Sequence, residues 1–337
     1  MKRSLFFLFF IALGMTALQS CLFNGDEDDE NILGNWIRRS DFEGIPRSNA
    51  VSFTIGNIAY VGLGYDGEDD LRDFWRYDAA LDFWQRVDSF PGEGRRGAVA
   101  FAIGNRGYIG TGYNADLQNE ELGDFWEFNP DAPSGQQWTR KADFVGTPRY
   151  NSVGFSINGK GYIGTGYDGN WLKDFYEYDP DTDTWTQVVS LKGAKREEAF
   201  AFVIDGKAYV GGGRNNGIYE YDFWAFDPAS QEWTQKNDLN EDDNYAVIRH
   251  AGLGLSVGGL GYAIGGMSSS TVLGTVWEYD PNADLWEKKN NIEGSTRIHL
   301  AGFVINNRLF ITTGNASGTR LDDTWEFKPF DELDDED

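Results

Sequence analysis

Residues 149–179 read RYNSVGFSINGKGYIGTGYDGNWLKDFYEYD, and variants of this stretch recur along most of the chain. Its centre, YIGTG at 162–166, is an aromatic residue followed by small and glycine-rich positions. Copies of this centre begin at Tyr60, Tyr108, Tyr162, Tyr209, Tyr262 and Phe310. Six copies spaced by about 50 residues predict a repeat architecture.

Each copy carries further signatures at fixed distances from this centre. The segment before it begins with an arginine: Arg47, Arg95, Arg149, Arg196, Arg249 and Arg297. The segment after it is aromatic and opens with Asp73, Asp124, Asp174, Asp222, Thr275 and Asp323. A tryptophan then follows at Trp84, Trp138, Trp185, Trp233 and Trp286. Alternation within these segments, as in Tyr176, Glu177 and Tyr178, predicts β-strands.

The first two strands of each repeat meet at pairs such as Gly56-Asn57, which tolerate positive φ and suit two-residue hairpins. On the arginine strand one face is small (Ala98, Ala100) and the other is large (Phe101), as crowded strands around an axis require. With four strands per unit and a period near 50, residues 34–330 resemble the kelch family. The resemblance implies an all-β fold, a six-bladed propeller with four-stranded blades.

The sixth copy lacks its tryptophan strand because the chain ends soon after Pro329. The missing strand lies at the other end of the chain, where Trp36 stands one repeat before Trp84. We expect the N-terminal strand around Trp36 to complete the last blade. This closure removes an exposed sheet edge.

The composition excludes several classes of protein. The 337 residues carry 54 acidic and 29 basic side chains, a formal net charge of −25. Such a polyanion repels phosphate backbones, so we expect no nucleic-acid partner. One cysteine cannot form an internal disulfide or a thiolate zinc cage, and two histidines leave little room for a histidine metal site. We therefore expect no metal and no cofactor.

The N-terminus resembles an export signal. Lys2 and Arg3 precede an apolar run, Leu5 to Leu18, that is too short to span the roughly 30 Å of a hydrocarbon core. The sequence LQSC ending at Cys21 resembles the bacterial lipobox, which implies a signal peptide at 1–20 and lipidation of Cys21. An ordinary secretory signal with an incidental Cys21 is the alternative.

The segments on either side of the propeller are acidic. Residues 21–33 are the lipidated cysteine and an acidic linker, and 331–337 an acidic disordered tail. We expect a monomeric domain held at the outer membrane by its N-terminal lipid. Acidic residues just behind the cysteine resemble a signal for exposure at the cell surface.

The long loops indicate where a site belongs. In four-stranded blades, the link from the second to the third strand and the link between blades emerge on one face, around the channel mouth. The six arginines begin the innermost strands and are expected to ring that mouth, where an arginine fork binds carboxylate or phosphate. The predicted ligand-binding residues are Arg47, Arg95, Arg149, Arg196, Arg249, Arg297, Tyr65, Tyr113, Tyr167, Arg214 and Asn151. The alternative is that the arginines only tie the inter-blade loops.

Other polar residues are assigned by their place in the repeat. The aspartates that open the aromatic strands recur in five copies, so we expect them to be structural acceptors of backbone hydrogen bonds. His250 and His299 are predicted to lie on opposite strand faces and not to share a ligand. Trp171 and Tyr219 lie in loops outside the repeat pattern and are contact candidates.

Three functions remain open. The first is a lipoprotein whose propeller mouth binds a glycan or a protein partner without catalysis. The second follows from a resemblance to the six-bladed kelch epimerase of N-acetylneuraminate, and implies Glu198 as general acid/base with Arg149, Arg196 and Arg249 on a substrate carboxylate. The third is a structural subunit of an envelope assembly. Galactose oxidase chemistry needs a cysteine cross-linked to a copper-bound tyrosine. Cys21 is the only cysteine and is assigned to the lipid anchor, so we do not expect this chemistry.

Overall fold

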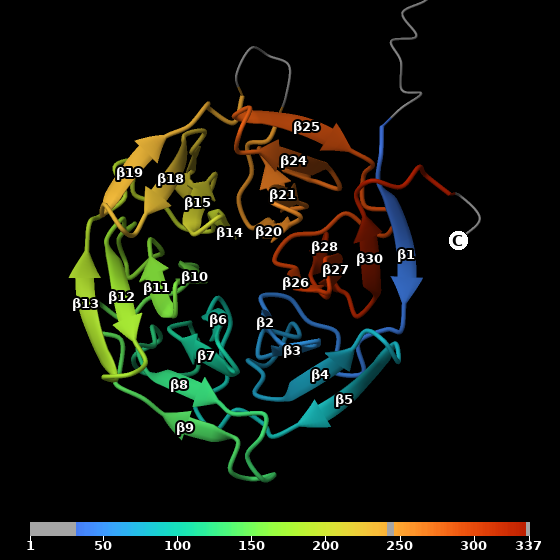
Figure 1. The fold of residues 1–337 in the computed structure, drawn as a ribbon. Coiled ribbons are helices and arrows are strands. Elements are labelled where there is room, and N and C mark those ends of the chain that lie inside the picture. The colour runs from blue at the N-terminus through green and yellow to red at the C-terminus, as the bar shows by residue number, and fades with distance from the viewer. Residues whose placement is uncertain (1–31, 241–245, 335–337) are drawn as a thin grey trace, which may run out of the picture. The chain divides into compact units, whose positions relative to one another are not determined.

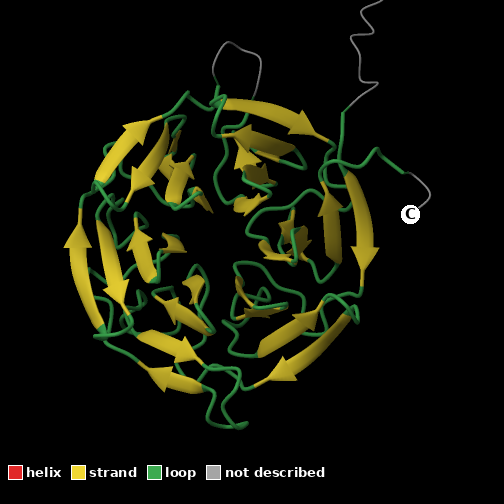
Figure 2. Cartoon of the chain, viewed as in Figure 1, coloured by secondary structure: helices red, strands yellow, loops and turns green. Residues whose placement is uncertain are grey.

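The computed structural model describes residues 32–240 and 246–334, which belong to the compact unit Ile32–Asp337. The predicted signal peptide, Cys21, the predicted linker up to Asn31 and the last three residues of the acidic C-terminal segment lie outside the described residues. The described part is built from strands and loops (Figure 2), and it contains no helix long and apolar enough to cross a bilayer.

Six four-stranded antiparallel sheets form the blades of a ring (Figure 1). Blade 1 contains β2 (Val51–Ile55), β3 (Ile58–Gly62), β4 (Phe74–Asp78) and β5 (Phe83–Val87). Blade 2 contains β6 (Val99–Ile103), β7 (Arg106–Gly110), β8 (Phe125–Phe128) and β9 (Trp138–Arg140). Blade 3 contains β10 (Val153–Ile157), β11 (Lys160–Gly164), β12 (Phe175–Asp179) and β13 (Thr184–Val188).

The remaining blades follow the same order from the axis outward. Blade 4 contains β14 (Phe200–Ile204), β15 (Lys207–Gly211), β18 (Phe223–Asp227) and β19 (Glu232–Gln235). Blade 5 contains β20 (Leu253–Val257), β21 (Leu260–Ile264), β24 (Val276–Asp280) and β25 (Leu285–Lys289). Blade 6 contains β26 (Ala301–Ile305), β27 (Arg308–Thr312), β30 (Thr324–Lys328) and β1 (Asn35–Arg39).

In blades 4 to 6 a two-stranded hairpin is inserted between the second and third strands. These hairpins are β16 (Arg214–Asn215) with β17 (Ile218–Tyr219), β22 (Met267–Ser268) with β23 (Thr271–Val272), and β28 (Asn315–Ala316) with β29 (Thr319–Arg320). The expected all-β, six-bladed architecture is confirmed.

The N-terminal strand closes the ring as expected. Strand β1 pairs antiparallel with β30, from Asn35 opposite Lys328 to Arg39 opposite Thr324, and Figure 1 shows the two side by side. Trp36 is fully buried, with its ring 4.5 Å from that of Phe327. The last blade is therefore built from both ends of the propeller, and the outer edge of β30 is paired.

Large residues of one blade fill space that small residues of the next leave open. A Cβ added to Gly107 on β7 would lie 2.2 Å from the ring of Phe53 on β2. Gly161 stands in the same relation to Phe101, and Gly261 to Phe202. Since blades converge toward the axis, only such close approaches pack the inner strands without voids.

In five of the six blades an outer tryptophan fastens the blade to the one before it, whereas the indole N–H of Trp286 in blade 5 has no hydrogen-bond partner among the described residues. The indole N–H of Trp138 donates to the backbone carbonyl of Asp88 at 3.0 Å, and that of Trp185 donates to Ala142 at 3.1 Å. A buried indole needs such a partner, so the repeated tryptophan serves both packing and polar satisfaction. The result is a rigid scaffold on which the mouth residues are displayed.

Candidate binding site at the channel mouth

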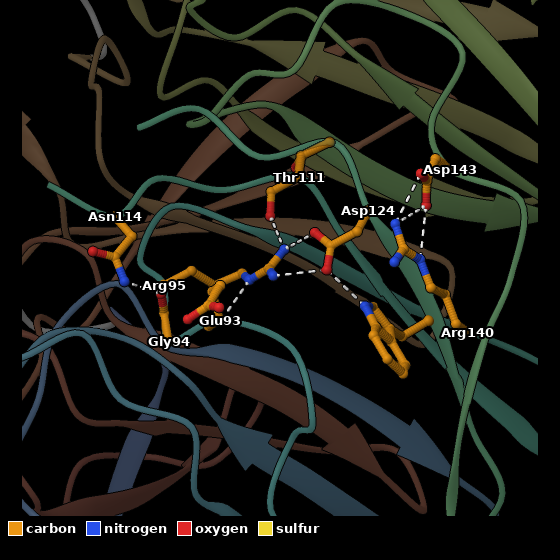
Figure 3. Close-up of polar contacts among 9 residues, drawn as sticks. Glu93, Gly94, Arg95, Thr111, Asn114, Asp124, Arg140 and Asp143 are labelled. Carbon is orange, nitrogen blue, oxygen red and sulfur yellow. Dashed lines mark hydrogen bonds and ion pairs between the residues drawn. The ribbon is translucent and has the colours of Figure 1, made fainter. Parts of the chain in front are cut away.

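The six repeat arginines do not line an open mouth. All six side chains are 0% exposed. In blade 2, Arg95 binds both oxygens of Asp124 at 2.6 and 2.9 Å and also donates to the carbonyls of Thr111 and Glu93 (Figure 3). The expectation of an accessible arginine ring is wrong, because each guanidinium is consumed by contacts inside its own blade.

The aspartates that open the third strands have a different structural role from the one expected. Asp124 accepts from the Arg95 guanidinium and from the indole of Trp126 at 2.7 Å, rather than from loop backbone. Burial by itself raises the pKa of Asp124, but the hydrogen bonds and charge of Arg95 outweigh it and hold the pKa below its usual range. The same pairing joins Arg47 to Asp73, Arg149 to Asp174, Arg196 to Asp222 and Arg297 to Asp323.

Blade 5 breaks this rule. Thr275 stands where the other blades have aspartate, so Arg249 is held by the carbonyls of Ala263, Gly265 and Thr275 and by the Thr275 hydroxyl. Burial without a carboxylate lowers the pKa of Arg249 to about 9. Within the described part of the chain, Arg249 is therefore the one repeat arginine whose buried positive charge is not paired with an aspartate.

The rim of the mouth is formed by pairs of residues that follow the repeat motifs. The residue after each arginine bridges to the residue after each glycine motif, and we call these the rim pairs: Ser48–Tyr65, Arg96–Tyr113, Tyr150–Tyr167, Glu197–Arg214, His250–Met267 and Ile298–Asn315. Their backbone geometry is shared by all blades, whereas their side chains differ. Chemistry that is specific to this protein therefore resides where the repeats disagree.

Inside the rim pairs lies a second ring, which we call the inner belt. Its members are Asn49, Gly97, Asn151, Glu198, Ala251 and His299, and all have φ between 52° and 61°. Backbone N–H groups pass from blade to blade along it, for example Glu198 N to Asn151 O at 2.9 Å and His299 N to Ala251 O at 2.8 Å. The inner belt surrounds a cavity of about 150 Å³.

Rim and inner belt meet in a hydrogen-bonded cluster around Glu198. Its Oε2 lies 2.6 Å from His250 Nδ1 and 3.0 Å from Arg214 Nε, and its Oε1 lies 2.8 Å from His299 Nε2. His250 and His299, which were not expected to share a ligand, share Glu198 as a hydrogen-bond partner. Positive φ turns the chain at the inner belt, and the two oxygens of one carboxylate reach both rings.

The cluster keeps Glu198 ionised. Burial alone raises the pKa of this carboxyl group, but hydrogen bonds with His250 and His299 and the positive charge of Arg214 outweigh it, so the pKa lies well below its usual range. A buried, charged and doubly contacted carboxylate at a channel mouth is a recognised mark of a functional position.

Beside this cluster lies an open pocket of about 340 Å³. Its lining residues are Tyr150, Asn151, Tyr167, Trp171, Glu197, Arg214, Asn216 and Gly217. Glu197, which is 6% exposed, accepts hydrogen bonds from Asn151 at 2.9 Å and from the indole of Trp171 at 3.3 Å. The predicted residues Asn151, Tyr167 and Arg214 are thus brought together here.

Tyr65 and Tyr113 lie further along the rim, in a different environment. The Arg96 guanidinium stacks over Tyr65 at 3.8 Å and over Tyr113 at 5.5 Å, and it pairs with Asp70 at 3.0 Å. Burial raises the pKa of Asp70 to about 6, with Arg96 opposing that rise. Tyr113 also packs against Tyr150 at 4.9 Å, so an aromatic arc leads from blade 1 to the pocket.

Sequence reasoning missed Arg96, Tyr150 and Glu197. Each follows a repeat arginine, and attention to the arginine itself obscured the variable residue next to it. The available signal was that the residue after the repeat arginine differs in all six copies, which indicates that the fold does not determine the side chain at this position.

Two other kinds of cavity occur in the described residues. An axial channel continues below the inner belt, lined by small residues of the innermost strands such as Ala100 and Gly254. A groove of about 900 Å³ lies by the loop 117–124, and its lining includes the carboxylates of Glu93, Glu121 and Asp168. Within the described part of the chain no group of three or more His, Cys, Asp or Glu is arranged to hold a metal ion.

Comparisons with known proteins agree with this architecture. A family model described as "KLHDC2/KLHL20/DRC7 Kelch-repeats domain" matches residues 144–314. Among solved structures, one titled "Structure of YjhT" is similar with a TM-score of 0.72 at 15% identity, covering 85% of this chain and 95% of that chain. At this identity the likeness shows the fold alone. No curated protein matches the sequence.

Proposed function

The chain belongs to the kelch-repeat family, and from that premise we propose that its propeller mouth binds a glycan without catalysing a reaction on it. The observation that carries the proposal is the pocket beside Glu198, where variable residues of the rim pairs and the inner belt converge. Kelch repeats build the scaffold, and function lies in the residues placed on it.

The pocket offers the kinds of contact that sugars use. Asn151 and Arg214 supply donors, Glu197 supplies acceptors, and Tyr167 and Trp171 supply aromatic surface. Its volume of about 340 Å³ lies within the range of roughly 300–1,000 Å³ that is usual for small-molecule sites. Because these groups already bond to one another, little ordering is needed when a ligand binds.

The accessible charges favour a neutral or cationic glycan over an anionic one. The repeat arginines are buried, Arg96 pairs with Asp70, and Arg214 is shared by Glu197 and Glu198. An anion would have to compete with these carboxylates. A protein partner that presents neutral or basic groups is the other ligand that such a mouth would suit.

We expect the unit Ile32–Asp337 to give specific hits on a glycan array. For such a glycan, Arg214→Ala should weaken binding about tenfold or more, since a lost hydrogen bond to a charged group costs about 1.5–3 kcal/mol. Asn151→Ala should weaken binding less, by up to about tenfold, since a hydrogen bond between neutral groups contributes about 0.5–1.5 kcal/mol. Isothermal titration calorimetry measures the loss, and thermal unfolding shows whether each variant is folded. Tyr221→Ala, an exposed aromatic residue outside the pocket, is the control. An array without hits would contradict the proposal.

A second candidate is exchange of sugar anomers, favoured by the contact of Glu198 with two imidazoles. In this reaction a base removes the proton of the anomeric hydroxyl, an acid protonates the ring oxygen, and reversal closes the ring on the other face. A carboxylate beside histidines offers both roles. Arg149, Arg196 and Arg249 are buried and do not serve a substrate carboxylate, so this candidate rests on the Glu198 cluster.

Anomer exchange of N-acetylneuraminate, followed by NMR, tests the enzymatic candidate. Acceleration by the intact protein should be lost in Glu198→Gln, which keeps the size of the side chain but removes the base, while thermal unfolding reports its fold. If the intact protein gives no acceleration, the candidate is rejected and binding without catalysis remains.

We also propose that the protein is a lipoprotein anchored through Cys21 at the outer membrane, with the propeller exposed at the cell surface. Support comes from the apolar run, the LQSC segment and the acidic residues that follow it. A structural role in an envelope assembly is the remaining alternative, and it predicts a membrane protein that copurifies with the anchored chain.

A further inference from the structure

Three aromatic rings surround the pocket beside Glu197. Tyr150 and Tyr167 have centroids 5.7 Å apart and planes at 71°, and Tyr167 meets Trp171 at 5.2 Å and 65°. All three side chains line the same cavity. Rings at steep angles to one another form the corners of a box, whereas a sugar ring stacks best on a single flat face.

One wall of this box is negatively charged and fixed in place. The Glu197 carboxylate is buried and accepts hydrogen bonds from Asn151 and from the indole of Trp171. The indole therefore orients the carboxylate, and the carboxylate orients the ring. Tyr150, Tyr167, Trp171 and Glu197 together are called the cage below.

The acidic side chain that lines the pocket is Glu197. Among the described residues that line the pocket, Arg214 is the one cationic side chain, and its Nε lies 3.3 Å from Glu197 and 3.0 Å from Glu198. Arg214 is therefore shared between the two carboxylates, and Glu198 is also in contact with His250 and His299, away from the cage. Burial, together with the negative charge of Glu197, raises the pKa of Tyr150 to about 12, so its ring stays neutral.

We propose that the cage binds a compact ammonium group of the ligand, either a methylated ammonium or the protonated amine of an amino sugar. Aromatic faces attract a cation through their quadrupole, and the carboxylate offsets the loss of its hydration. A neutral group of the same shape gains neither contribution. The inference rests on the proposed function in placing the ligand at this mouth, and it adds the charge of the group that is recognised.

The experiment compares cations with uncharged molecules of matching shape. Calorimetry on the unit Ile32–Asp337 measures choline against 3,3-dimethylbutan-1-ol, and glucosamine against glucose. We expect at least one cation to bind about tenfold or more tightly than its neutral counterpart. Preference for choline identifies a methylated ammonium as the source, and preference for glucosamine identifies an amino sugar.

Variants assign the preference to the cage. Trp171→Leu removes an aromatic face but keeps an apolar side chain, and Glu197→Gln removes charge but keeps size. Each should reduce binding of the preferred cation about tenfold, whereas Tyr221→Ala should leave it unchanged. Thermal unfolding confirms that the variants are folded.

Equal affinity for cation and neutral counterpart in both pairs would overturn the inference, as would full binding by both Trp171→Leu and Glu197→Gln. Failure of the cage and failure of the proposed function give different results. Neutral glycans that bind while both cations fail would reject the cage and keep the glycan site. Choline binding without any array hit would keep the cage and reject the glycan.

Discussion

Every blade contains a buried arginine, and the residue that accepts its hydrogen bonds differs between blade 5 and the other five. In five blades the arginine forms an ion pair with an aspartate. Arg95 contacts both carboxylate oxygens of Asp124, and Arg196 contacts one oxygen of Asp222. Removing the partner of a buried charge costs about 3–5 kcal/mol. Arg249 lacks a carboxylate partner because blade 5 has Thr275 where the other five blades have aspartate.

Thr275→Asp should therefore stabilise the propeller. The new carboxylate would meet the Arg249 guanidinium as Asp124 meets Arg95, and a charge-assisted hydrogen bond is worth about 1.5–3 kcal/mol. Thermal unfolding should show a midpoint raised by a few degrees, since about 1 kcal/mol shifts it by roughly 2–4 °C in a domain of this size. Thr271→Asp, at an exposed position of strand β23 in the same blade, is the control. An unchanged or lowered midpoint in Thr275→Asp would contradict the expectation.

Spacing along the chain located the arginines but could not tell whether they face solvent. The partner of Arg95 lies 29 residues away, on the third strand of its blade, and both residues recur in the same repeats. Recurrence of Arg and Asp together in five copies was the available signal for an internal pair. Arg214 and Asn151 were selected by their places in the repeat, after the glycine strand and after the repeat arginine, and both line the pocket at the mouth.

At the scale of elements, closure depends on one short strand. Strand β1 is bound to β30 by its backbone ladder and by Glu326, which accepts from Arg39 on β1 at 2.8 Å and from Arg308 on β27 at 2.6 Å. Burial alone raises the pKa of Glu326, but the two arginines outweigh it and hold the pKa below its usual range. This carboxylate ties three strands of blade 6 together.

Glu326→Gln should lower the free energy of unfolding at neutral pH. The loss should approach the roughly 3–5 kcal/mol of a broken buried pair, reduced because Arg39 and Arg308 are partly exposed. Because the folded pKa is depressed, the contribution is fully present above the unfolded value of about 4.3 and is lost as the pH falls through the folded value. Urea unfolding from pH 7 to pH 3 measures this.

Glu332→Gln, a change on the exposed C-terminal segment, is the matched control and should leave the free energy of unfolding unchanged at every pH. If Glu326→Gln differs from the unchanged protein by a constant amount down to pH 3, its carboxylate is not the group that supports closure.

The order and pairing of the strands were predictable from the sequence, but the inner belt was not. Strands are predicted from the alternation of apolar and polar residues and from glycine or asparagine at the hairpin turns, and both signals are local in the sequence. The inner belt places Glu198 and Ala251 at positive φ although neither favours it, because hydrogen bonds to the neighbouring blade fix the backbone. Such a conformation is set by tertiary contacts, and so the shared contact of both histidines with Glu198 was missed.

At the scale of the whole molecule, the proposed membrane anchor and the proposed binding site lie in different parts of the sequence. The segment around Cys21 lies outside the described residues, and its role as an anchor is a proposal. The compact unit Ile32–Asp337 carries the mouth, the cage and the closure. Binding and anchoring should therefore be separable.

Cys21→Ser should move the protein from the membrane fraction to the soluble fraction, because a hydroxyl cannot receive the lipid thioether. Cell fractionation followed by immunoblotting measures the shift. Ser20→Ala, which keeps a small residue before the cysteine, should remain with the membrane. Retention of Cys21→Ser in the membrane fraction would show that the anchor lies elsewhere, without affecting binding at the mouth.

The pairing of β1 with β30 also imposes an order on biogenesis. Asn35 emerges among the first folded residues, yet its partner Lys328 lies almost at the end of the chain. During synthesis the first strand has no partner strand until the segments that form the other five blades have been made. The ring shuts only when the last strand arrives, so a prematurely terminated chain carries an orphaned strand at one end and an incomplete blade at the other, two edges by which quality control can recognise it.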